Sequence, residues 1–142
     1  MLDEPTPEAS LSKAAPRLNA NSLSALRALD PSGGTAFVRR VLETYLRSLD
    51  KHIDNVRTAL AAGDLAALRS VAHTLKSSSS SVGALDFAAR SAEVEAVLRQ
   101  RLEHPEPGTE PLTGLGELLA GYLDEALQVR SAVVCELAGG AA

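Results

Sequence analysis

The sequence predicts an all-α fold, an antiparallel up-down-up-down four-helix bundle preceded by a short extra N-terminal helix. Apolar residues recur at intervals of three and four along four long stretches, which is the spacing of helices with one buried face. Hydrophobic residues make up 45% of the 142 residues, aromatic residues only 3%, and Trp is absent, so the core must consist mainly of Leu, Ala and Val. This composition favours helices over strands.

Five helical stretches are expected, each bounded by capping or turn residues. Ser22 and Asp64 are the expected N-caps of the first and third helices, and Gly63 and Gly83 end the second and third. Residues 30–34 read as a turn, and the segment from 104 to 114, with three prolines, reads as a loop. The expected helices are Leu23–Leu29, Thr35–Leu60, Leu65–Ser81, Ala84–Leu102 and Leu115–Leu137.

One domain accounts for most of the chain. Residues 1–20 carry Pro5, Pro7 and Pro16 among small and charged residues, so we expect a disordered arm or linker there. The bundle is expected over residues 21–138, and residues 139–142, which read Gly-Gly-Ala-Ala, are expected to fray. The sequence shows no internal repeat.

Charge and cysteine content exclude several classes of protein. The net charge is −4 and no long basic block occurs, which argues against a nucleic-acid partner. Cys135 is the single cysteine and cannot form an internal disulfide, so a reducing compartment fits. No apolar run reaches the ~20 residues of a membrane span, and the N-terminus lacks the features of a signal peptide. We therefore expect a cytoplasmic protein without membrane contact.

The third expected helix presents a histidine to solvent. At about 100° per residue, His73 points roughly 160° away from the inward-facing Leu75. Small and cationic side chains share this outer side of the helix, which is an unusual environment for a histidine that serves only packing. The residues that accompany His73 there are Arg69, Ser70, Lys76, Ser77 and Ser80.

The pattern His73-x-Leu75-Lys76, with Val82-Gly83-Ala84 closing the block, resembles the signature of the histidine phosphotransfer (HPt) domain family. Together with the helix pattern, the resemblance extends from about Asn21 to about Leu137. Members of that family carry a phosphoryl group on one histidine in phosphorelays. The family usually has Gly directly after the Lys, whereas this chain has Ser77, which places a hydroxyl at that position.

If the histidine accepts a phosphoryl group, its neighbours have candidate roles. His73 would be phosphorylated, Lys76 would neutralise phosphoryl oxygens, and Arg69 is a candidate second cation. Ser77 is placed to donate a hydrogen bond to the same oxygens. The neighbouring contacts to phosphate or to the partner protein would come from Ser80 and Gly83.

Glu95 is the candidate partner of the imidazole. It lies at the flank of the buried face of the fourth helix, about 60° from Leu98. From spacing alone it is equally well a solvated carboxylate. The resemblance implies that Glu95 accepts a hydrogen bond from Nδ1 of His73, which would leave Nε2 free as the nucleophile.

The expected function is a phosphoryl carrier and not an enzyme. The sequence has no Gly-rich nucleotide loop, so we expect neither ATP binding nor autokinase activity. The resemblance implies response-regulator receiver domains and a hybrid sensor histidine kinase as partners, with Mg²⁺ held by the receiver. No cofactor or metal is expected in this chain, since its three histidines are widely spaced. We expect the protein to be a monomer.

Two other functions remain open from the sequence. The chain is alternatively the phosphoacceptor segment of a larger hybrid histidine kinase, or an adaptor bundle in which His73 is inert.

The other two histidines, His52 and His104, are interpreted as ordinary surface groups. The run Ser77–Ser81 indicates either a surface that requires small side chains or low-complexity drift.

Overall fold

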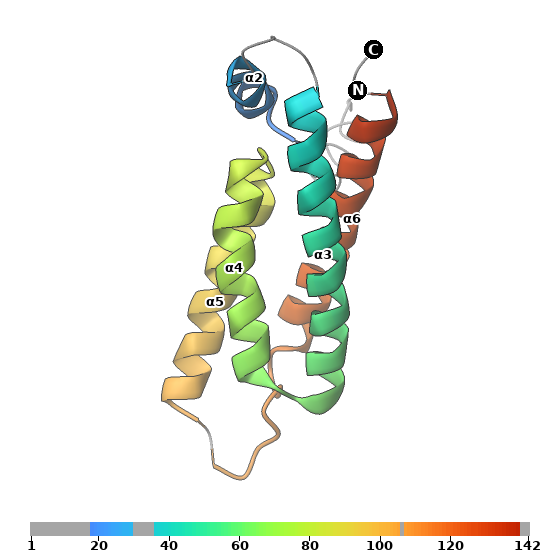
Figure 1. The fold of residues 1–142 in the computed structure, drawn as a ribbon. Helices are drawn as coiled ribbons and strands as arrows, with labels where there is room; N and C mark the ends of the chain where they lie inside the picture. Colours follow the sequence, from blue (N-terminus) through green and yellow to red (C-terminus); the bar gives the residue numbers. More distant parts are fainter. Residues whose placement is uncertain (1–17, 30–35, 106, 140–142) are drawn as a thin grey trace, which may run out of the picture.

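The computed structural model describes residues 18–29, 36–105 and 107–139, and helices account for most of them (Figure 1). No strand occurs within these ranges, so the predicted all-α fold is confirmed. The expected turn at 30–34, most of the arm at 1–20 and the last three residues lie outside them. The helices are α2 (Ala20–Ala28), α3 (Ala36–Ala62), α4 (Leu65–Ser81), α5 (Leu85–Glu103) and α6 (Gly116–Gly139).

The four long helices surround one aliphatic core. The helix α4 packs against α3 and α5, and α6 also packs against α3 and α5, while the short α2 lies against α3 (Figure 1). Leucine, valine and alanine side chains from all of these helices form one buried cluster, as the composition predicts. The largest fully buried side chains are those of Tyr122 and Phe87, whose rings stack with centroids 5.2 Å apart.

Two glycines end α3 and α4 as predicted. Gly63 and Gly83 have φ angles of +67° and +87°, in the left-handed region that glycine adopts without strain. After Gly83, the Ala84 amide donates to the Ser79 carbonyl, and the Gly83 amide donates to Ser80, which is the Schellman pattern of hydrogen bonds. These turns are short, so α3, α4 and α5 follow one another closely along the chain.

Asp64 caps α4 as predicted, but the cap of α2 differs from the prediction. The Asp64 carboxylate accepts from the Ala67 amide at 3.0 Å. The helix α2 begins three residues before the expected Leu23 because Asn19, and not Ser22, is its N-cap; the Asn19 side chain accepts from the Ser22 amide at 2.8 Å. Asn is as good a capping residue as Ser, so spacing alone did not distinguish the two.

Two hydroxyl pairs join neighbouring helices inside the core. The Tyr45 hydroxyl on α3 and the Ser79 hydroxyl on α4 lie 2.7 Å apart, and Ser91 on α5 makes the same contact with Tyr122 on α6. Burial raises the pKa of Tyr45 to about 12 and also raises the pKa of Tyr122. Both tyrosines therefore stay neutral, and each pair satisfies polar groups that would otherwise be costly to bury.

Candidate functional site

His73 projects from the middle of α4, and its side chain is 66% exposed. Its neighbours in sequence, Ala72 and Leu75, are almost completely buried, so the amphipathic pattern of α4 turns the imidazole outward as predicted. One edge of the ring is held from the next helix, because Nδ1 lies 2.7 Å from Oε2 of Glu95 on α5. The other ring nitrogen, Nε2, has no protein partner among the described residues.

Glu95 is buried, with only 6% of its surface exposed, so it is not a solvated carboxylate. Its second oxygen, Oε1, accepts a hydrogen bond from Nζ of Lys76 at 2.8 Å. His73 and Lys76 are three residues apart on α4, which places them on adjacent turns of one face. A single carboxylate therefore holds both side chains, and Lys76 is engaged with Glu95 in this structure.

The charge state of Glu95 determines which ring nitrogen carries the proton. The hydrogen bond from Lys76, and then that from His73, lower the pKa of Glu95, whereas burial opposes this shift. Glu95 is thus ionised at neutral pH, and an ionised carboxylate only accepts hydrogen bonds. The proton must therefore lie on Nδ1 of His73, and in the neutral imidazole the lone pair of Nε2 faces outward.

Three further side chains from the sequence prediction lie at the surface of α4. Arg69, Ser77 and Ser80 are exposed, on the outer side of the helix that carries His73. At this surface the Ser77 carbonyl accepts a hydrogen bond from the Ser81 hydroxyl at 3.1 Å. The structure thus brings these groups to the same face without joining them to the imidazole.

Gly83 lies elsewhere. It is buried beneath α2, where its carbonyl accepts from the Asn19 amide at 2.8 Å. A Cβ at this position would lie 3.0 Å from atoms of Asn19 and Ser22. The glycine therefore allows α2 to pack against the corner between α4 and α5, and it is not part of the open face.

The sequence interpretation missed Arg99. This exposed residue on α5 lies one turn beyond Glu95, at i+4, and forms no ion pair within the described residues. Arg69 lies one turn before His73 on α4, and Arg99 lies one turn after Glu95, the residue that contacts His73 from α5. The i+4 spacing from Glu95 is the signal that would have identified it.

His52 is half-buried, so the prediction of an ordinary surface group is wrong for this residue. It lines a groove of about 310 Å³ between α3 and α4, and its Nδ1 is buried without a hydrogen-bond partner. Burial, and then the nearby charge of Lys51, lower its pKa. His104 is exposed in the α5–α6 loop, as predicted.

Within the described part of the chain, no group of three or more His, Cys, Asp or Glu side chains is arranged to hold a metal ion. The helices described there also include none that is long and apolar enough to cross a membrane. The hydrogen-bonded cluster of His73, Lys76 and Glu95 is the candidate functional site.

The model of the Hpt domain family matches residues 40–130, which is more than half of the chain and includes all three residues of the cluster. The chain belongs to the Hpt domain family. A comparison with curated proteins finds no match. Among solved structures, the chain is similar to the crystal structure of histidine-containing phosphotransfer protein B (HptB) from Pseudomonas aeruginosa PAO1. The two are 26% identical with a TM-score of 0.67, over 87% of this chain and 96% of that one.

Membership in the Hpt family gives the general function. Hpt domains are phosphocarriers in two-component phosphorelays, in which they exchange a phosphoryl group with receiver domains and kinases. This chain is thus a histidine phosphotransfer domain, and the resemblance read from His73 to Ala84 is confirmed at the level of the family.

Proposed function

We propose that His73 is the phosphorylated residue and that the chain relays a phosphoryl group between the aspartates of receiver domains. The observation that carries this proposal is the exposed imidazole whose Nδ1 is bound to the Glu95 carboxylate. That contact leaves Nε2 as a nucleophile on an open helix face, accessible to a large partner.

The transfer step follows from this geometry. The Nε2 lone pair attacks the phosphorus of a receiver phosphoaspartate, the bond between phosphorus and the aspartyl oxygen breaks, and the aspartate leaves as a carboxylate. The phosphorylated ring keeps the Nδ1 proton and carries positive charge, which the Glu95 carboxylate stabilises. The reverse step, onto a second receiver aspartate, regenerates the neutral imidazole. Phosphoryl transfer depends mainly on positioning and charge stabilisation, so the carrier needs little further chemistry.

Surrounding residues are proposed to contact the phosphoryl group or the receiver. Arg69 supplies a cation that is free of ion pairs within the described residues, and Ser77 and Ser80 supply small hydroxyl side chains. Lys76 contacts the phosphoryl oxygens only if it leaves Oε1 of Glu95 or bridges both groups. Gly83 is omitted from this surface because it is covered by α2.

The proposed carrier acts as a monomer, with a hybrid sensor histidine kinase and receiver domains as partners. It holds no cofactor, has no autokinase activity, and relies on Mg²⁺ bound by the receiver. We also propose that the four long helices alternate in direction, up-down-up-down. The short turns at Gly63 and Gly83 and the course of the chain in Figure 1 support this arrangement. The cytoplasmic location stays a prediction.

Incubation with a phosphorylated receiver domain tests the proposal. The chain is expected to acquire a label that is labile in acid and stable in alkali, and the variant His73→Gln is expected to acquire none. Labelling that persists in His73→Gln would contradict the assignment. Labelling only by an ATP-loaded kinase domain would favour a segment of a hybrid kinase, and no labelling from either source would favour an adaptor.

A further inference from the structure

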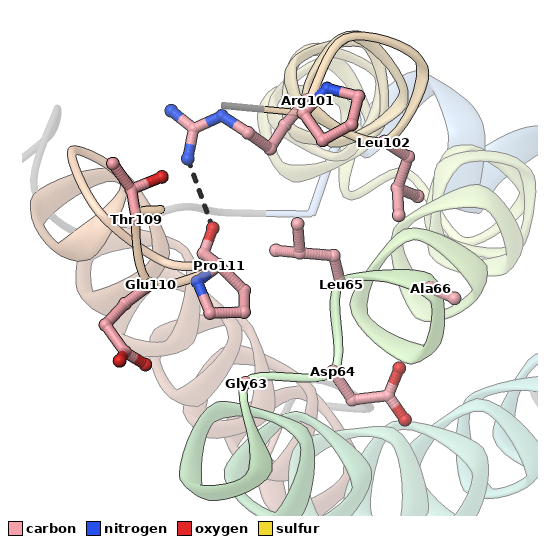
Figure 2. A pocket seen from close by; sticks show the side chains of 10 residues that line it. Gly63, Asp64, Leu65, Ala66, Arg101, Leu102, Thr109, Glu110 and Pro111 are labelled. Carbon is pink, nitrogen blue, oxygen red and sulfur yellow. Dashed lines mark hydrogen bonds between the residues drawn. The ribbon is translucent and has the colours of Figure 1, made fainter. Parts of the chain in front are cut away.

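A cavity of about 380 Å³ lies between the beginning of α4, the end of α5 and the loop that leads to α6 (Figure 2). Leu65, Leu102 and Pro111 give it apolar walls. The guanidinium of Arg101 is already hydrogen-bonded, because it donates to the carbonyls of Pro111 and Thr113 at 3.1 and 2.8 Å. These bonds hold the loop against α5, so the wall formed by Pro111 is fixed in place (Figure 2).

On both α4 and α5, residues that line the cavity lie on the same side of the helix as the residues of the proposed phosphotransfer site. Ala66 lies seven residues before His73 on α4, and Leu102 lies seven residues after Glu95 on α5. Seven residues make 700°, only about 20° short of two full turns, and advance about 10 Å along a helix. Ala66 and Leu102 are both exposed, Leu102 to 37%. The side of the cavity that they form therefore belongs to the same α4–α5 face as the imidazole.

Two arginines lie between the cavity and the histidine. Arg69 is one turn before His73 and Arg99 is one turn after Glu95, and within the described residues neither forms an ion pair. The face thus presents a mainly apolar cavity, whose lining also includes Asp64 and Glu110, then two cations, then the imidazole. A receiver domain that carries phosphoaspartate and Mg²⁺-binding carboxylates has negative charge to place against the two cations.

We propose that this cavity is an anchor pocket for an apolar side chain of the receiver domain that exchanges phosphate with His73. This inference rests on the proposed function and extends it to partner binding. A typical interface covers ~800 Å² on each partner, equivalent to a disc of about 16 Å radius. The edge of the cavity at Ala66, about 10 Å from His73 along α4, falls within the footprint of such an interface centred on His73. Preformed apolar pockets of this kind are where interfaces concentrate their affinity.

The test separates docking from chemistry. The variant Leu102→Asp places a charge at the cavity, and Ala66→Arg places a long side chain at its exposed edge. With the receiver domain that labels the wild-type chain, each variant is expected to raise the half-saturating receiver concentration by about tenfold or more. The small donor phosphoramidate, which passes its phosphoryl group to Nε2 and releases ammonia, is expected to label both variants at the wild-type rate.

The matched control is Val134→Asp on α6, since Val134 is exposed to 39% and lies on a helix that does not carry the site. It is expected to change the half-saturating concentration less than twofold. Wild-type half-saturation in both Leu102→Asp and Ala66→Arg, with circular dichroism showing both folded, would overturn the anchor pocket and leave the proposed function intact. A wild-type chain that no receiver labels would instead overturn the proposed function.

Discussion

The helix α4 packs against α5 and against α3, and we call these two interfaces the α4–α5 seam and the α3–α4 seam. The hydrogen bonding of buried polar groups differs between them. In the α4–α5 seam, both oxygens of the buried Glu95 are bonded, to His73 and to Lys76, and the cluster reaches the surface. In the α3–α4 seam, Tyr45 and Ser79 satisfy each other, but Nδ1 of His52 is buried without a partner. Both seams contain a histidine, yet only one provides a carboxylate that orients the ring. A carboxylate on the next helix thus fixes which nitrogen of a helical histidine carries the proton.

The largest expected effect comes from removing the orienting carboxylate. Glu95→Ala is expected to slow transfer from a phosphorylated receiver, because the Nδ1 proton loses its acceptor. A hydrogen bond to a charged group contributes about 1.5–3 kcal/mol, which corresponds to about a 10- to 100-fold lower rate. Rapid-quench measurement at saturating receiver gives this rate. Glu93→Ala, which removes an exposed carboxylate paired with Arg90, is the control and is expected to transfer normally. Equal rates for the two variants would contradict the role of Glu95.

Substitutions in the α3–α4 seam are expected to change the free energy of unfolding and not the rate of phosphoryl transfer. Ser79→Ala leaves the Tyr45 hydroxyl buried without its partner, so the free energy of unfolding should fall by about 1–3 kcal/mol. The exposed Ser80→Ala is the control, and it should stabilise slightly because Ala favours helix by a few tenths of a kcal/mol. Urea denaturation measures both. Equal stability of the two variants would show that the hydroxyl pair contributes nothing.

Low pH is expected to reduce the stability that ionised Glu95 contributes in the α4–α5 seam. The pKa of Glu95 is lower in the folded chain than its ordinary value of 4.5, so its ionised form stabilises the fold above that pH. This contribution is lost as the pH falls below 4.5 and through the lowered pKa. The stability difference between wild type and Glu95→Gln should therefore shrink from about pH 6 to about pH 3. Urea denaturation across this range measures it, and a difference that grows towards low pH would contradict the ionised state of Glu95.

The smallest effect is expected at His52. Replacing it with Leu removes a buried nitrogen that has no partner, so the free energy of unfolding should rise by up to about 1 kcal/mol. Receiver-dependent labelling of this variant should match wild type, in contrast to His73→Gln. A His52→Leu variant that fails to accept phosphate would remove the distinction between the two seams.

Features that depend on neighbours along the chain were predictable from the sequence. Gly63, Asp64 and Gly83 act within one turn of their own position, and the outward direction of His73 follows from the helix period. Features that depend on helix-to-helix register were not. The burial of Glu95, the pairing of Tyr45 with Ser79 and the partial burial of His52 require knowing which residues of two helices meet. Family resemblance identified Glu95 as the partner of His73, whereas spacing alone did not distinguish that role from a solvated carboxylate.

The tight corner at Gly83 has a consequence for how the length of this chain can vary. His73 and Glu95 meet across a corner of only a few residues, so the alignment of α4 with α5 is set by residue count. One residue inserted within either helix between them would rotate the following part by about 100° and move it about 1.5 Å, which separates the ring from its carboxylate. The segment between α5 and α6 follows both residues and does not affect this alignment. Homologous domains are therefore expected to vary in length after Glu103 and to conserve the interval of 22 residues between the histidine and its acceptor.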